Sequence, residues 1–156
     1  MKILVTGGCG YKGSVLIPRL LNDGHYITNI DTQWFLNSLP NHDRLNNIKG
    51  NILQSNSISL DGFDSIIHLA NIANDPAVDL NPTLSWEVNV LAGQQLIDRA
   101  TRSGVKQFIY ASSGSVYGIK DENKVTEDLP LVPISVYNKT KMVAERVFLS
   151  YSHLIQ

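Results

Sequence analysis

The sequence has 156 residues, of which 43% are hydrophobic and 17% are charged, and its net charge is -1. This balance is typical of one globular domain with a core, and thirteen basic against fourteen acidic residues, without a basic run, give no electrostatic reason for binding nucleic acid or an anionic membrane. No stretch approaches the roughly 20 apolar residues that span a bilayer, and the first apolar run is too short for a signal peptide, so we expect a cytoplasmic protein.

Short apolar runs alternate with helical segments along the chain. The runs are mostly apolar at consecutive positions rather than at alternate ones, which is typical of parallel strands buried on both faces of a sheet. This alternation predicts right-handed crossovers and one doubly wound parallel α/β domain of the Rossmann type over residues 1–156. The predicted strands are 2–5, 25–31, 47–50, 65–70 and 105–111, and the predicted helices are 11–22, a weaker 55–60, 82–102 and 136–150.

Three glycines follow the first predicted strand at a spacing of three: Gly7, Gly10 and Gly13. Glycines between a strand and a helix permit a tight turn and let the backbone approach a pyrophosphate, which the N-terminus of the helix attracts. Asp31 ends the second predicted strand 18 residues after Gly13, close to the roughly 20 expected for an acid that binds ribose hydroxyls. The pattern predicts a dinucleotide site.

The residues around this pattern favour NAD over NADP. No lysine or arginine occurs between Asp31 and Arg44, so nothing nearby would neutralise a 2′-phosphate, which the carboxylate of Asp31 would repel. Lys12 at the start of the helix opposes the helix dipole unless an anion is bound there, so a solvated side chain and a phosphate contact both stay open.

A tyrosine-lysine pair and a run of serines lie toward the other end of the chain. Tyr137 and Lys141 are four residues apart on a predicted helix and therefore share a face, where the ammonium could stabilise a phenolate and make Tyr137 a general base. Ser112 and Ser113 follow the strand 105–111, at the end of a parallel strand where ligands of such sheets bind. The glycine pattern, the acid after the second strand, the serines after a strand and the tyrosine-lysine pair are together improbable by chance in this chain order.

No metal site is expected. Cys9 is the lone cysteine and fits as a small filler in the glycine turn. His68, at the end of a predicted strand, is expected to pack near the cofactor rather than bind a metal.

The chain resembles, over essentially its whole length, the N-terminal part of the extended short-chain dehydrogenases/reductases, in the NAD-dependent epimerase/dehydratase group that acts on nucleotide sugars. The resemblance implies that Ser113 takes the catalytic Ser/Thr position, that Tyr137 is the acid/base, and that Lys141 binds the nicotinamide ribose and assists the tyrosine. The matching stretches are 6–13, Asp31, 68–70, Asn89, 112–118 and 137–141.

The resemblance also implies the contacts of NAD. The family usually has Asp at the position of Asn51, although an amide oxygen can still accept from the adenine amine. Asn89 is expected to fix a backbone or water contact near the site. The implied cofactor-binding residues are Gly7, Gly10, Tyr11, Lys12, Gly13, Asp31, Asn51, Ile52, Leu69, Ala70, Asn89, Ser112, Tyr137 and Lys141.

The residues after Ser113 bear on the reaction. Similar 4,6-dehydratases place an Asp-Glu pair there, because removing water needs a further acid and base, whereas this chain has Gly114 and Ser115. Dehydration is therefore disfavoured. The resemblance then implies hydride transfer at C4 of a hexose: Tyr137 takes the hydroxyl proton, NAD takes the hydride, and Ser113 hydrogen-bonds the developing carbonyl. Return of the hydride to the other face gives an epimer, and release of the keto sugar gives an oxidoreductase.

The length leaves two classes of function open. Members of the family continue for roughly 150 further residues, which supply more strands and a substrate domain. The chain is therefore expected to be either part of a longer protein or a natural short form. Two functions stay open, an enzyme acting on a nucleotide sugar and an NAD-binding or interaction module without turnover, and the intact set of Ser113, Tyr137 and Lys141 favours the enzyme.

The predicted helix 82–102 carries two apolar stripes. One stripe can face the sheet, and the other would stay exposed in a monomer. We therefore expect a homodimer through the helices 82–102 and 136–150, which is also how the resembling family commonly associates; the alternative is that a further segment covers the stripe. The stripes are Leu84, Val88, Leu91 and Ala92 on one side, and Trp86, Val90, Gly93 and Ile97 on the other.

Overall fold

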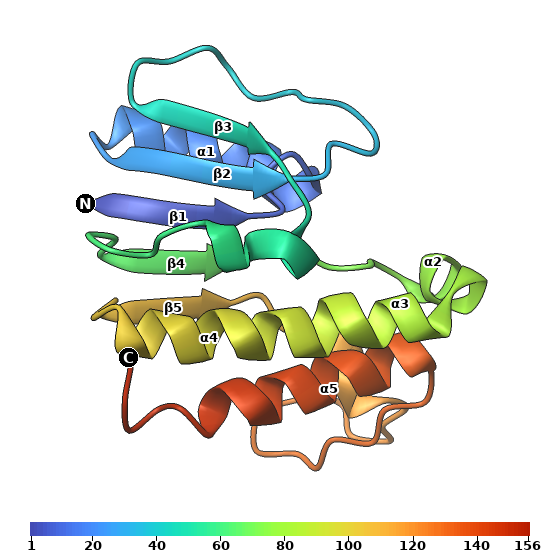
Figure 1. The fold of residues 1–156 in the computed structure, drawn as a ribbon. Helices are drawn as coiled ribbons and strands as arrows, with labels where there is room; N and C mark the ends of the chain where they lie inside the picture. The colour runs from blue at the N-terminus through green and yellow to red at the C-terminus, as the bar shows by residue number, and fades with distance from the viewer.

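The computed structural model describes residues 1–156, apart from the side chains of residues 55 and 57. The chain forms one parallel five-stranded sheet in the order β3-β2-β1-β4-β5 (Figure 1). Because the order reverses between β1 and β4, the carboxyl ends of these strands form a switch point where ligands bind in such folds. The predicted doubly wound sheet is confirmed. The strands are β1 Lys2–Thr6, β2 Tyr26–Asp31, β3 Leu45–Lys49, β4 Ser65–His68 and β5 Gln107–Tyr110.

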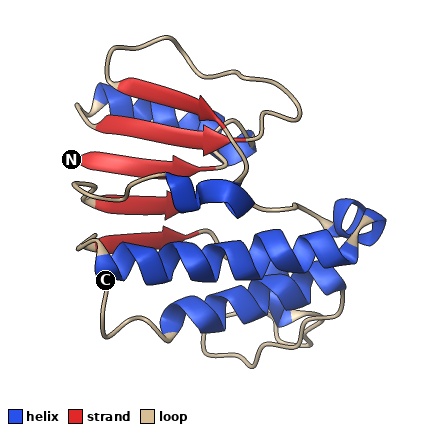
Figure 2. Cartoon of the chain, viewed as in Figure 1, coloured by secondary structure: helices blue, strands red, loops and turns tan.

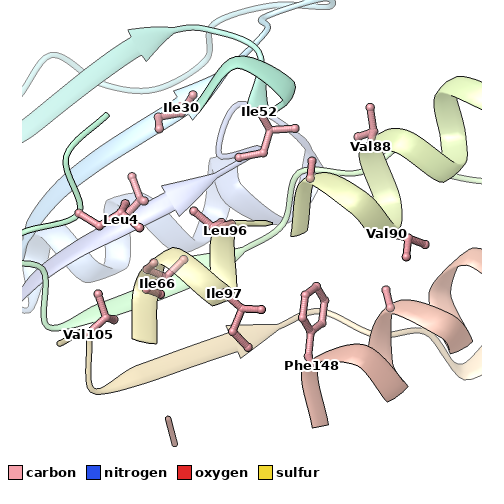
Figure 3. Close-up of a cluster of buried hydrophobic side chains, with 14 of the residues drawn as sticks. Leu4, Ile30, Ile52, Ile66, Val88, Val90, Leu96, Ile97, Val105 and Phe148 are labelled. Carbon is pink, nitrogen blue, oxygen red and sulfur yellow. The ribbon is translucent and has the colours of Figure 1, made fainter. Parts of the chain in front are cut away.

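Both faces of the sheet are covered, as the continuous apolar strands predict (Figure 2). Successive side chains of a strand point to opposite faces, so Ile3 and Val5 pack with α1 (Tyr11–Asn22), while Leu4 belongs to the larger cluster on the other face. Figure 3 shows this larger cluster, in which side chains of the sheet meet those of the long helical segment and of the last helix.

The helical ranges predicted at 11–22, 82–102 and 136–150 agree with the structure within one residue, whereas the weaker stretch predicted at 55–60 is a 3-10 turn over Ile52–Ser57, and two further segments were not predicted. Residues 82–102 form one continuous helical segment that begins as predicted: Asn81 Oδ1 accepts from Leu84 N at 3.0 Å, and Pro82 opens the first turn. No helix among those described is long and apolar enough to cross a membrane. The elements are the 3-10 turns η1 (Ile52–Ser57) and η3 (Gly114–Tyr117), α2 (Asp75–Leu80), α3 (Pro82–Trp86), the π-helical η2 (Glu87–Ala92), α4 (Gly93–Arg102) and α5 (Val136–Leu149).

The expectation that one stripe of the segment 82–102 stays exposed in a monomer is wrong. Val90 is 7% exposed and Ile97 is 2% exposed, because α5 packs against this side within the same chain. The two helical layers lie so close that a Cβ on Gly93 would meet Phe148 Cζ at 2.6 Å. The apolar stripe therefore gives no reason for a dimer.

Candidate functional site

A cleft of about 590 Å³ opens at the carboxyl ends of β1, β2 and β4, at the switch point of the sheet. The glycine turn, the end of β2 and the first turns of α5 supply parts of its wall, so segments from both ends of the chain meet there. The predicted site residues that line the cleft are Gly7, Gly10, Tyr11, Lys12, Gly13, Asp31, Asn51, Ile52, Leu69, Ala70, Ser112, Tyr137 and Lys141.

The glycine turn is built by close backbone packing. Gly7 has a φ of +75°, which favours glycine, and its N–H donates to Ile30 O at 2.8 Å. A Cβ on Gly7 would meet Ala70 N at 2.5 Å, and a Cβ on Gly13 would meet Gly8 O at 2.3 Å. The turn is thus pressed between β4 and the start of α1, and side chains at these positions would fill the space beside the cleft.

The start of α1 is suited to an anion. No side chain caps this helix at Gly10, and its first turn contains no acidic residue. The N–H groups and the positive dipole end of an uncapped helix attract a phosphate. Lys12, which is exposed and lines the cleft, adds a cation to this turn. These residues fit the pyrophosphate of a dinucleotide.

Asp31 lies at the end of β2 with both carboxylate oxygens engaged. Its Oδ2 accepts from Cys9 N at 2.9 Å, and its Oδ1 accepts from Gln33 N at 2.7 Å. These bonds tie the carboxylate to the glycine turn and fix its place on the cleft wall. Trp34, which is 63% exposed, lines the same end of the cleft.

Lys141 is almost completely buried, with 3% of its surface exposed. Its Nζ donates to Ala111 O at 2.6 Å and lies 4.1 Å from the ring centroid of Tyr110. Burial, and then the positive charge of Lys12, lower the pKa of the Lys141 ammonium to about 8, against the opposite effect of Glu145. Lys141 is therefore mainly an ammonium at neutral pH. Tyr137, one turn earlier on α5, lines the cleft beside it.

The two serines after β5 have different partners. Ser113 caps η3, since its Oγ accepts from Ser115 N at 3.2 Å and lies 2.7 Å from Ser115 Oγ, and it is not part of the cleft wall. Ser112 is part of the wall, and its hydroxyl donates to Glu145 Oε2 at 2.5 Å. The structure thus brings Ser112 to the cleft and turns the predicted catalytic Ser113 toward Ser115.

Asn89 lies behind the cleft wall rather than on it, with 1% of its surface exposed. Its Oδ1 accepts from Ile72 N at 2.7 Å, and its Nδ2 donates to Ile72 O at 3.1 Å and to Thr140 Oγ1 at 3.0 Å. Thr140 Oγ1 in turn donates to Tyr137 O at 2.8 Å. Asn89 therefore fixes backbone beside the site, joining the wall residue Ile72 to the helix of Tyr137.

His68 is fully buried beneath the site, and its Nδ1 is hydrogen-bonded to Thr6 Oγ1 at 2.7 Å. Burial, and then the charge of Lys141, lower the pKa of His68 to about 3, so the imidazole is neutral at physiological pH. Thr6 Oγ1 also accepts from Ala70 N at 3.3 Å. His68 and Thr6 together hold β1 and β4 at the floor of the cleft.

Sequence reasoning missed Glu145 and Thr140 as supports of the site. The position of Glu145 could have been predicted, because Tyr137, Lys141 and Glu145 follow one another at a spacing of four and therefore share a helix face. The role of Thr140 could not, since its partner Asn89 lies 51 residues away in sequence.

Comparison with known proteins gives consistent matches over nearly the whole chain. The model of the NAD dependent epimerase/dehydratase family matches residues 3–154. A UDP-glucose 4-epimerase of Corynebacterium glutamicum is 33% identical over 154 residues, which are 97% of this chain and 47% of that protein. A 3 beta-hydroxysteroid dehydrogenase/Delta 5-->4-isomerase of Mycobacterium tuberculosis is 34% identical over 158 residues, which are 96% of this chain and 42% of that protein.

Solved structures agree. MoeE5 in complex with UDP-glucuronic acid and NAD matches with a TM-score of 0.86 at 33% identity, over 97% of this chain and 50% of that chain. The UDP-N-acetylglucosamine 4-epimerase from Methanobrevibacter ruminantium M1 matches with a TM-score of 0.91 at 27% identity, over 97% and 50% respectively. The chain spans about half the length of the relatives that it matches.

Proposed function

Because the chain belongs to the NAD-dependent epimerase/dehydratase family, we propose that it forms the cofactor-binding and catalytic half of a nucleotide-sugar enzyme that transfers a hydride at a sugar hydroxyl carbon. One observation carries this proposal: Tyr137 and Lys141 line the same cleft as the glycine turn and Asp31. NAD is the cofactor of this family, and the similar MoeE5 was solved with NAD and UDP-glucuronic acid. Epimerisation is the first candidate reaction.

Different residues of the cleft would bind different parts of the dinucleotide. The start of α1 from Gly10 to Gly13 would hold the pyrophosphate, and Asp31 would accept from the hydroxyls of the adenosine ribose. Asn51 and Ile52 line the wall where the adenine would lie, and Leu69 and Ala70 line the floor. Asn51 Oδ1 already accepts from Leu53 N at 3.0 Å, and its second lone pair remains for the adenine amine.

The reaction assigns the proton to Tyr137. When bound, NAD supplies the hydride acceptor and later donor. The phenol oxygen of Tyr137 takes the proton of the sugar hydroxyl. It returns the proton after the keto sugar has rotated to present its opposite face to the cofactor. The Lys141 ammonium stabilises the phenolate, which requires a pH near or below 8, because the pKa of Lys141 is lowered to about 8. Ser113 would polarise the developing carbonyl, for which its hydroxyl must leave Ser115.

Two alternatives keep specific support. An oxidoreductase would use the same groups and release the keto product; the similarity to a hydroxysteroid dehydrogenase/isomerase favours keeping it. An NAD-binding module without turnover is the other candidate; the chain spans about half the length of its relatives. Dehydration is disfavoured, because Gly114 and Ser115 at the start of η3 supply no carboxylate. A homodimer through the outer sides of the segments 82–102 and 136–149 remains a proposal by analogy with the family.

We expect NAD to bind at least about tenfold more tightly than NADP, because the carboxylate of Asp31 repels a 2′-phosphate. Calorimetry and the fluorescence of Trp34 at the cleft would measure both affinities. Asp31→Asn should lower the affinity for NAD and reduce the ratio of the NAD and NADP affinities. Asp121→Asn, at an exposed position, should change neither quantity. Equal affinities in the unaltered protein would contradict the assignment.

Turnover separates the enzyme from the module. The chain and any longer form of the protein would each be incubated with NAD and a panel of UDP- and dTDP-sugars, and the products separated by chromatography. We expect the longer form to convert one sugar into its 4-epimer. Tight NAD binding without any conversion by either form would favour the module, and absence of NAD binding would overturn the proposal.

A further inference from the structure

Helix α5 contacts three consecutive residues that follow or end β5. The ammonium of Lys141 lies over the ring of Tyr110 and donates to Ala111 O, and Ser112 donates to Glu145 on the next turn of the helix. Ala111 and Ser112 are both part of the cleft wall. Lys141 and Glu145 thus hold the same short segment from neighbouring turns, so the wall is fixed by α5 at this point.

The hydrogen bond between Ser112 and Glu145 is a charge-assisted one. Its length of 2.5 Å is that of a hydroxyl donating to an ionised carboxylate. Such a bond fixes where the carboxylate of Glu145 lies relative to the helix. Since Glu145 follows Lys141 by four residues, the carboxylate and the ammonium are on one face of α5.

The charges around Lys141 make the role of this carboxylate specific. His68 is neutral at physiological pH, as described above, and burial raises the pKa of Tyr110, so that its phenol is neutral as well. Lys12 repels the ammonium, and Glu145 attracts it. The groups that face Lys141 in the described part of the chain are Lys12 of α1, His68 of β4, Tyr110 of β5, and Tyr137 and Glu145 of α5.

Taking the role of Lys141 from the proposed function, we propose that Glu145 is a positioning residue of this site: it clamps Ser112, and with it the residue after β5 to which Lys141 donates, to helix α5. Glu145 touches neither the cofactor nor the sugar in this scheme. It acts through Lys141, whose charge the phenolate of Tyr137 needs, and through Ser112, whose place on the wall it sets. Loss of the carboxylate should therefore change the pH at which Lys141 loses its proton.

Nuclear magnetic resonance of protein labelled with 13C- and 15N-lysine tests this directly and needs no cofactor. The Lys141 signal, assigned by its loss in Lys141→Arg, would be followed from pH 6 to pH 11. We expect a midpoint near 8 in the unaltered chain, and a midpoint lower by at least about half a pH unit in Glu145→Gln. Glu145→Asp, which keeps the charge, should restore most of the difference, and Glu127→Gln, at an exposed position, should leave the midpoint unchanged.

Two further measurements keep the outcome decisive. Glu145→Met, an uncharged side chain of similar length, replaces Glu145→Gln in the same titration if the latter does not fold. The affinity for NAD, measured by calorimetry between pH 6 and pH 9.5, should begin to fall at a lower pH in Glu145→Gln than in the unaltered chain. A merely structural role would lower the affinity at every pH equally.

The failure of this proposal differs from failure of the proposed function. If the Lys141 midpoint in Glu145→Gln and Glu145→Met stays within about 0.2 pH units of the unaltered value, the role of Glu145 is overturned even when NAD binds. If the midpoint falls as expected but NAD does not bind, the positioning of Lys141 stands and the proposed function fails instead.

Discussion

Gly13→Ala is expected to destabilise the protein by about 3 kcal/mol and to weaken NAD at least tenfold. The added methyl group would lie 2.3 Å from Gly8 O and 2.4 Å from Gly8 Cα. Both atoms belong to backbone, so α1 must move away from the glycine turn rather than a side chain rotate. This movement displaces the N–H groups at the start of α1, which would bind the pyrophosphate, from their place in the cleft wall. Urea unfolding and calorimetry would measure the two effects.

A control variant at a second glycine distinguishes the effect of the close packing around Gly13 from the effect of replacing any glycine by alanine. A Cβ on Gly114 meets no atom within 4 Å, and Gly114 shares with Gly13 a φ outside the left-handed region, so Gly114→Ala should cost less than about 1 kcal/mol. If Gly13→Ala bound NAD as tightly as Gly114→Ala, the glycine turn would not be the phosphate cradle.

The sheet and the helices could be read from the sequence because each rests on local patterns. The predicted strands overlap all five observed ones, although Leu45 and Ile48 are the only apolar residues of β3, and the start at residue 82, predicted from its cap and proline, is that of the long helical segment. The short α2 had a similar signal, since Asn74 Oδ1 accepts from Ala77 N at 3.1 Å and Pro76 stands in its first turn, but its six residues carry no apolar period. The π-helical η2 had no such signal, and Asn89 within it bonds to Ile72 and Thr140, which lie 17 and 51 residues away.

The errors concern partners that are distant in sequence. A helix pattern shows which sides are apolar but not which element covers them. One of the two stripes was therefore expected to lie exposed, whereas α5 covers the side of Val90 and Ile97 within the chain. Both serines were predicted at the site, Ser112 as a cofactor contact and Ser113 as the catalytic serine, and only the fold shows that Ser112 lines the cleft. The convergence of the glycine turn, Asp31 and the pair on α5 was predictable, since the chain order of motifs in an α/β sheet places them at one edge.

Lys141→Met is expected to stabilise the protein at pH 7 while weakening NAD and abolishing turnover. Burial and Lys12 lower the pKa of Lys141 from 10.5 to about 8, so the folded state disfavours the ammonium that is present at pH 7. A pKa depression of this size lowers the stability of the unaltered protein by about 3 kcal/mol. Loss of the hydrogen bond to Ala111 O lowers the stability of the variant by about 1 kcal/mol. The net gain of about 2 kcal/mol should raise the melting temperature by roughly 5 °C.

The pH dependence of this gain distinguishes a charge effect from better packing. Below pH 8 both the folded and the unfolded chain carry the ammonium, and the whole penalty is present. Between about pH 8 and pH 10.5 the folded chain loses this proton first, so the unaltered protein gains stability with rising pH and the advantage of Lys141→Met disappears. Lys139→Met, an exposed position of the same helix, should show neither effect. A Lys141→Met protein that melts lower than the unaltered chain at pH 7 would mean that the contacts of the buried ammonium with Ala111 O and Tyr110 stabilise the fold more than its burial destabilises it.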